Sequence, residues 1–156
     1  MVQATPFLVV LFLALVAPGL AVKKVHADFS PLQCILTGEW KNDLGSNMTI
    51  YDIKENGNFS GMYLTAVAAT KREILASPLR GSQHLPNQQN QSTFGFTVHW
   101  SFTNTTSVFT GQCFVGENGK EILKTMWLLR SYVDKMEDDW KATLVGYNIF
   151  ERLESR

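Results

Sequence analysis

Polar side chains that could hold a ligand stand beside a tryptophan near the front of the chain, in the stretch TGEWKNDLGSNMTI. Asn42 and Ser46 follow Trp40 closely and enclose Asp43, Leu44 and Gly45. Asn-Asp and Gly-Ser are typical of a hairpin turn. Amide and hydroxyl groups next to an aromatic side chain are also typical of a ligand pocket. This stretch alone leaves both interpretations open.

Signatures of catalysis are weak. The sequence has no Gly-x-Ser-x-Gly motif, and no Cys or Ser stands in a recognisable relation to a His. His26, His84 and His99 are scattered without metal-ligand spacing. The neighbouring Asp138 and Asp139 are interpreted as a solvated turn. We therefore expect no enzyme, no metal and no cofactor.

Composition and charge limit the partners. The 156 residues suit one domain, and 14 basic and 14 acidic residues give a formal net charge of zero. A neutral chain argues against nucleic acid, which requires a basic face. The apolar run FLVVLFLALVAPGLA predicts a secretory signal peptide over residues 1–21, with an approximate cleavage site. A membrane anchor is the alternative, but the run is short for a bilayer span, so we expect a secreted, extracellular protein without a membrane partner.

Secretion affects how cysteines and Asn-x-Ser/Thr sequons are interpreted. Cys34 and Cys113 are the only cysteines, and in an oxidising compartment they predict one disulfide. Two buried free thiols are the alternative. Four sequons fall at predicted turns or strand ends and are glycosylation candidates. They are Asn47, Asn58, Asn90 and Asn104.

Strands with alternating side chains must position the polar groups. In TFGFTVHWSF, large apolar residues alternate with small or polar ones over ten residues. Similar runs cover residues 34–42, 47–54, 58–67, 77–84, 93–102, 105–115, 121–131 and 142–153. Short turns between them favour antiparallel neighbours, and eight such strands can close into an up-and-down barrel that holds one small ligand. The predicted fold is all-β, with a lead-in at 22–33, a barrel at 34–153 and a tail at 154–156.

The last two predicted strands are apolar on both faces. Met126 and Leu128 alternate with one apolar set, and Val145, Tyr147 and Ile149 alternate with another. The outer face of a monomeric barrel should be polar, and self-association is the simplest cover for an apolar one. The pattern therefore predicts a homo-oligomer.

The inward faces are uncharged. If Trp100 and Trp127 point inward, the same alternation directs several aromatic, aliphatic and small polar side chains inward with them. These are Trp40, Asn42, Tyr63, Thr65, Val67, Ser107, Phe109, Thr125, Leu129 and Asn148. This composition suits a small, mostly apolar ligand with a neutral polar head. A core whose Asn and Thr side chains bond to each other is the alternative.

Several blocks together resemble the avidin/streptavidin family and, within it, the egg biotin-binding members. The blocks are TGEWKNDLGSNMTI, YLTAVAAT, TFGFTVHW, SVFTGQCF, NGKEILKTMWLLRS and DDWKATLVGYNIF. The resemblance covers Cys34 to about Leu153 with hardly any change of spacing. It implies an eight-stranded barrel, a homotetramer and biotin bound in each barrel mouth.

The resemblance also implies roles for individual residues. Asn42, Ser46 and Tyr63 would donate to the ureido oxygen of biotin, and Thr65 and Asn148 would accept from its two N–H groups. The other implied contacts are Trp100, Phe102, Phe109, Trp127 and Leu129 around the rings, Ser107 at the sulfur, Ala69, Thr70, Thr103 and Thr105 at the valerate carboxylate, Leu44 and Val67 elsewhere in the pocket, and Trp140 from a neighbouring subunit.

Departures from the egg members lie outside the ureido set. Ala68 stands where one egg member of the family has Thr, Leu144 where that member has Arg, and Tyr147 where it has a smaller apolar residue. One missing donor at Ala68 is worth about 0.5–1.5 kcal/mol, or up to about 3 if charge-assisted. Other positions keep a hydroxyl on a different side chain, namely Thr103, Thr105 and Ser107. These changes predict a biotin binder with somewhat faster release.

The predicted function is secreted, high-affinity, non-catalytic binding of biotin, for vitamin storage, transport or antimicrobial sequestration. A lipocalin-like carrier of another small lipophile is one alternative, and it would require a larger and more apolar cavity. An avidin-like structural assembly module that has lost binding is the other alternative.

Overall fold

The structure is a computed structural model that describes residues 33–85 and 92–153. The predicted signal peptide, nearly all of the lead-in, the tail and the sequon at Asn90 lie outside the described residues. Within the two described ranges, no helix has the length and apolar character needed to cross a membrane.

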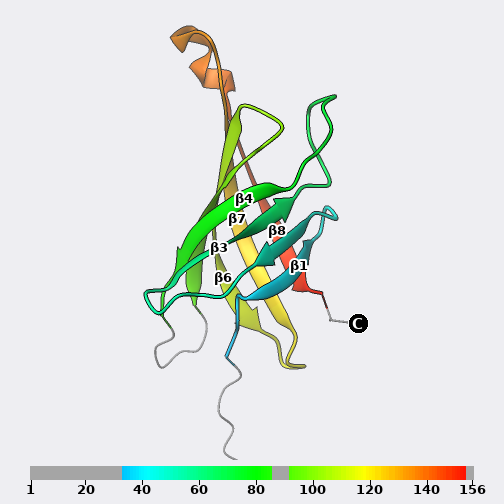
Figure 1. The fold of residues 1–156 in the computed structure, drawn as a ribbon, viewed down its shortest axis with the longest axis vertical. Coiled ribbons are helices and arrows are strands. Elements are labelled where there is room, and N and C mark those ends of the chain that lie inside the picture. Colours follow the sequence, from blue (N-terminus) through cyan, green and yellow to red (C-terminus); the bar gives the residue numbers. More distant parts are fainter. Residues whose placement is uncertain (1–32, 86–91, 154–156) are drawn as a thin grey trace, which may run out of the picture.

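Eight antiparallel strands follow one another around a closed barrel, in which β8 pairs with β1 (Figure 1). The strands are β1 Gly38–Asn42, β2 Asn47–Ile50, β3 Asn58–Leu64, β4 Ser77–Gln83, β5 Thr93–His99, β6 Thr105–Val115, β7 Glu121–Ser131 and β8 Thr143–Arg152. A short 3₁₀ helix, η1 Met136–Lys141, lies between β7 and β8. The predicted all-β, eight-stranded, up-and-down barrel is confirmed.

Two strands match the predicted ranges, and the others end earlier or start later. β6 and β7 coincide with 105–115 and 121–131. β5 ends at His99, because the Trp100 backbone N–H bonds to Thr105 and the chain turns there. The predicted acidic turn holds η1, in which Asp138 pairs with Lys141 and Asp139 pairs with Arg130. Alternation alone therefore overextended the strands into the loops.

Aromatic rings fill the interior between the closed end and the middle of the barrel. Phe94 stacks on Phe96, Phe96 stacks on Phe109 with centroids 4.6 Å apart, and Phe109 stacks on Tyr63 at 5.6 Å. Phe150 meets Tyr63 edge-on. These buried rings form the solid half of the barrel, and the other half is hollow.

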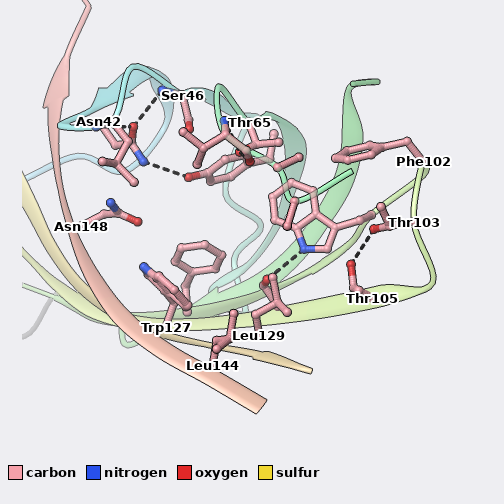
Figure 2. A pocket seen from close by; sticks show the side chains of 18 of the residues that line it. Asn42, Ser46, Thr65, Phe102, Thr103, Thr105, Trp127, Leu129, Leu144 and Asn148 are labelled. Carbon is pink, nitrogen blue, oxygen red and sulfur yellow. Dashed lines mark hydrogen bonds between the residues drawn. The ribbon is translucent and has the colours of Figure 1, made fainter. Parts of the chain in front are cut away.

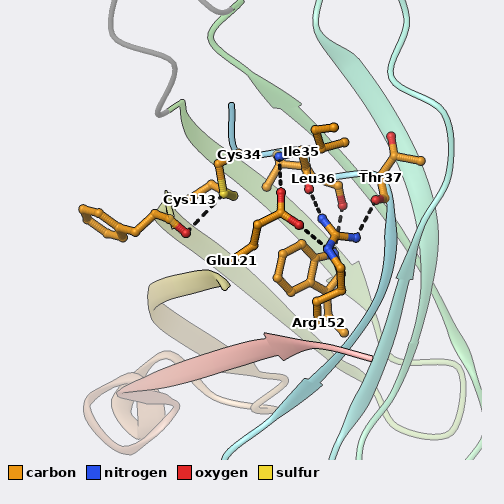
Figure 3. Close-up of a disulfide and its surroundings, with 9 residues drawn as sticks. Cys34, Ile35, Leu36, Thr37, Cys113, Glu121 and Arg152 are labelled. Atoms are coloured by element: carbon orange, nitrogen blue, oxygen red, sulfur yellow. Dashed lines mark hydrogen bonds and ion pairs between the residues drawn. A yellow bond between two sulfur atoms is a disulfide. The ribbon is translucent and has the colours of Figure 1, made fainter. Parts of the chain in front are cut away.

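An ionic cluster and a disulfide close the solid end (Figure 3). Arg152, on the last strand, pairs with Glu121 and donates to the Thr37 carbonyl at 2.9 Å. Its guanidinium lies 4.2 Å from the centroid of the Trp40 ring. Cys34 and Cys113 form the predicted disulfide, with their Cα atoms 5.8 Å apart. The segment before β1 is thereby fixed across the barrel floor.

The outer face of β6, β7 and β8 is apolar and exposed, as the alternation predicts. Its exposed side chains are Val108, Met126, Leu128, Val145, Tyr147 and Ile149. A face this apolar is unusual on a monomer in water. The homo-oligomer itself stays a prediction.

Candidate functional site

A cavity of about 470 Å³ opens at the end of the barrel opposite the ionic cluster. All of the residues predicted to contact biotin line it except Thr70 and Trp140. The predicted inward residues Trp40 and Thr125 are buried outside it. Its lining is made of aromatic, aliphatic, hydroxyl and amide side chains, without a charged group among them. A cavity of this size and composition suits one small molecule.

The β1–β2 turn forms the polar corner of this cavity (Figure 2). Gly45 adopts φ +87°, which favours glycine, and its N–H closes the turn onto the Asn42 carbonyl at 2.9 Å. The Asn42 side-chain oxygen accepts from the backbone N–H groups of Leu44 at 3.1 Å and Ser46 at 2.8 Å. Both interpretations of this stretch therefore hold: it is a hairpin turn, and it orients the Asn42 amide toward the cavity.

Three side chains that can donate hydrogen bonds lie together at the polar corner. The Asn42 amide nitrogen donates to the Tyr63 hydroxyl oxygen at 3.2 Å, which leaves the Tyr63 proton available to a ligand. Ser46 Oγ accepts from the Ala66 backbone N–H at 3.0 Å, and its own hydroxyl lies within hydrogen-bonding reach of Tyr63. Burial raises the pKa of the Tyr63 hydroxyl above its ordinary value, so this group is a neutral donor at physiological pH.

Two acceptors lie near these donors. The Asn148 amide nitrogen donates to the Asp43 carboxylate at 2.8 Å, so the amide oxygen is the end left for the cavity. Thr65 Oγ1 donates its proton to the Val67 carbonyl at 2.7 Å and accepts from the Val67 backbone N–H. One lone pair of this oxygen is then left to accept a bond from a ligand. The Asp43 bond fixes which end of the Asn148 amide faces the cavity, and the Thr65 proton is already bonded, so both side chains present an oxygen acceptor to a ligand.

Aromatic side chains form the walls. The Trp100 indole N–H donates to Ser107 Oγ at 2.8 Å, which fixes the ring plane and leaves the serine proton for a ligand. Trp127 lies against Gly146 on the neighbouring strand, where a Cβ would overlap the indole. Phe109, which stacks on Tyr63, forms the bottom of the cavity. The absence of a side chain at Gly146 therefore leaves the space that the Trp127 indole occupies.

The rim of the cavity formed by the β5–β6 loop lies opposite Asn42 and Asn148 (Figure 2). Thr103 and Thr105 lie there with their hydroxyl oxygens 2.6 Å apart. Ala68 also lines the cavity but provides no hydroxyl. Thr70 does not line it, and its hydroxyl accepts from the backbone N–H of Arg72 at 3.2 Å.

Trp140 is placed away from the cavity of its own chain. Its side chain is 82% exposed on η1, which projects beyond the barrel (Figure 1). Only a partner surface could bury this side chain. Its predicted role in a neighbouring subunit stays a prediction.

Sequence reasoning did not assign three residues at the site. Asp43 belongs to the predicted turn, and nothing in a local pattern indicates its contact with Asn148, which is 105 residues away. Ser131 lines the rim in phase with Trp127 and Leu129, so the alternation could have found it. Leu144, a departure from the family pattern, also lines the cavity.

The arrangement suits recognition better than chemistry. No group of three or more His, Cys, Asp or Glu side chains in the described ranges could hold a metal ion. Donors and acceptors around an apolar box would fix the orientation of a neutral planar head that carries one acceptor oxygen between N–H groups.

Comparisons with known proteins agree with this geometry. The sequence model of the Avidin family matches residues 30–153. Avidin from Gallus gallus is 57% identical over 159 residues, covering 100% of this chain and 99% of avidin. The crystal structure of a biotin binding protein from chicken superposes with a TM-score of 0.75 at 55% identity, covering 78% of this chain and 98% of that one. Xenavidin gives 0.74 at 51% identity, covering 78% and 99%. The chain belongs to the Avidin family.

Proposed function

We propose that this protein binds biotin without catalysis, one molecule in each barrel mouth. The observation that carries the proposal is the arrangement of donors and acceptors at the polar corner. Asn42, Ser46 and Tyr63 place groups that can donate hydrogen bonds at this corner, while Thr65 and Asn148 offer oxygens beside them. The ureido group of biotin has the complementary pattern of one oxygen and two flanking N–H groups.

Convergence of three donors explains why such a site would bind tightly. Three hydrogen bonds to one urea oxygen polarise it toward an oxyanion-like form, and hydrogen bonds to developed charge are stronger than neutral ones. The donors are already oriented by Asn42 and its turn, so little ordering is required when the ligand enters. The aromatic walls would then enclose the bicyclic rings, with Ser107 at the sulfur.

A homotetramer forms part of the same proposal. The exposed apolar face of β6 to β8 supports subunit contact, and Trp140 lies outside its own cavity. Trp140 of one subunit would extend into the open end of the neighbouring subunit's barrel and cover the ligand there. Trp140→Ala is then expected to speed biotin release while leaving the melting temperature of the ligand-free subunit unchanged, because this side chain makes no contact that buries it in its own chain.

The biological setting is proposed on the same basis. Secretion fits the disulfide, and Asn47, Asn58 and Asn104 are exposed at turns or strand ends where glycans could be attached. Vitamin storage or transport and antimicrobial sequestration require the same pocket. Each would follow from tight binding of free biotin.

Calorimetric titration with biotin and, separately, with a fatty acid and a retinoid tests the proposal. We expect the calorimetric titration to give one biotin per chain and no saturable binding of either lipophile. Tryptophan fluorescence, followed in a parallel titration, should be quenched or shifted by biotin. Saturation by a lipophile but not by biotin would support the lipocalin-like alternative. Binding of none of the three by a folded protein would contradict the proposal and leave an assembly module.

A further inference from the structure

The cavity has an unmatched electrostatic requirement if, as proposed, the ligand is biotin. No lining residue is charged, yet biotin carries a carboxylate at the end of its valerate chain. A carboxylate is costly to remove from water without a partner of opposite charge. With the ureido group at Asn42 and Asn148, the carboxylate must reach the opposite side, where Thr103 and Thr105 lie (Figure 2).

Arg72 is the cation that connects the two loops at this rim. It lies on the β3–β4 loop, just after Val67, Ala68 and Ala69, which line the cavity. Its guanidinium Nη1 donates to the backbone carbonyl of Phe102 at 3.4 Å, and Phe102 lines the cavity from the β5–β6 loop. The side chain therefore reaches from one rim loop to the other.

The charge of Arg72 is available to a ligand. Within the described ranges Arg72 forms no ion pair, and one long hydrogen bond leaves most of its five N–H donors unused. Lys71 and Glu73, its neighbours in the loop, are both exposed. A planar guanidinium can bind a carboxylate through two parallel hydrogen bonds, which a threonine hydroxyl cannot do.

We propose that Arg72 recognises the ligand carboxylate and makes the site selective for free biotin over biotin in a neutral ester or amide linkage. The contact would replace the hydroxyl that Ala68 lacks at the same rim. Thr103 and Thr105 would still offer hydrogen bonds, but these are neutral and would favour the acid over the ester much less. Selectivity carried by Arg72 must therefore weaken as salt is added, since the arginine is exposed.

The test compares biotin with biotin methyl ester on the purified full-length secreted protein and two variants, at low and high salt. Arg72→Gln removes the charge and keeps a polar chain, and Lys71→Gln removes an equal charge from the adjacent position as the matched control. Affinities or release rates are measured for both ligands. Melting of each ligand-free variant shows that it is folded, and Arg72→Lys provides a second variant that keeps the charge without the planar fork.

We expect Arg72→Gln to weaken biotin binding about fivefold and to leave the ester within about twofold. Lys71→Gln should change the ratio of the two ligands by less than about twofold, and Arg72→Lys should lie between wild type and Arg72→Gln. The wild-type preference for the acid should fall at high salt.

An unchanged acid-to-ester ratio in Arg72→Gln, or an equal loss for both ligands, would overturn this inference while the proposed biotin site stands. A salt-independent preference would also overturn it. Failure of the wild-type protein to bind either ligand would instead overturn the proposed function, and this inference with it.

Discussion

The two ends of the barrel use polar groups in opposite ways. At the closed end, Arg152 and Glu121 are charged, paired with each other and bonded to backbone carbonyl and N–H groups of the segment before β1. At the open end the cavity lining is uncharged, and the hydroxyl groups of Tyr63 and Ser46 are oriented by bonds that they accept, from Asn42 and from the Ala66 backbone N–H, and can still donate. Polar groups at one end are satisfied internally, and those at the other are oriented but left available.

This difference separates stability from recognition. The closed end fixes the chain across the floor through the disulfide, the ionic cluster and the stacked rings. The open end can then hold binding groups at set positions without requiring them to pack against each other. Substitutions at the two ends should therefore affect different measurements.

The largest expected effect on recognition comes from Tyr63→Phe. The variant keeps the ring that stacks on Phe109 but loses the hydroxyl donor to the ureido oxygen. We expect biotin affinity to fall about 10- to 100-fold, because the lost bond is charge-assisted in the bound state. Competition with labelled biotin measures the loss. Tyr132→Phe, on an exposed tyrosine outside the cavity, is the matched control, and equal losses in both variants would refute the assignment.

Arg152→Met should act on stability instead. It removes the ion pair with Glu121 and the cation from the face of Trp40, and leaves a half-buried carboxylate without its partner. We expect the free energy of unfolding to fall by about 2 kcal/mol, as measured by urea denaturation, with biotin affinity unchanged.

The matched control for the closed end is Arg130→Met. Arg130 pairs with Asp139 at the exposed end of β7, so its loss should cost less than about 1 kcal/mol. If Arg152→Met weakened biotin binding as much as it weakened stability, the separation of the two ends would be wrong.

A smaller effect is expected from Asp43→Ala. The Asp43 carboxylate holds the Asn148 amide nitrogen, so its removal lets the amide rotate and present either end to the ligand. Loss of one orienting bond should weaken biotin binding about fivefold, with most of the change in the release rate. Asp52→Ala, on an exposed loop residue, should bind as wild type. Unchanged release from Asp43→Ala would remove Asp43 from the account.

The smallest effect is a pH dependence confined to alkaline solution. Burial raises the pKa of Tyr63 above its ordinary value of 10.0, so below pH 10 the hydroxyl is protonated in both folded and unfolded chains. Above that pH the unfolded chain ionises first, and folding stability must fall as pH rises. Urea midpoints for wild type should drop more steeply above pH 10 than those of Tyr63→Phe. Parallel curves would contradict the burial of this hydroxyl.

The sequence predicted the long strands and most of the cavity lining because both depend on alternation. β6 and β7 match their predicted ranges, and Trp127, Leu129 and Asn148 line the cavity as their phase requires. Alternation fails where the chain leaves the sheet: Trp100 and Phe102 continue the pattern, yet they lie in a rim loop. The contact of Asp43 with Asn148 could not be predicted, because it depends on closure of β8 onto β1.

Release of labelled biotin from the purified protein, with and without excess unlabelled biotin, tests the central claim most directly. Oriented donors and acceptors at the open end predict one biotin per chain and release over hours or longer. Absence of binding by folded protein would contradict the claim that this end of the barrel is a biotin site.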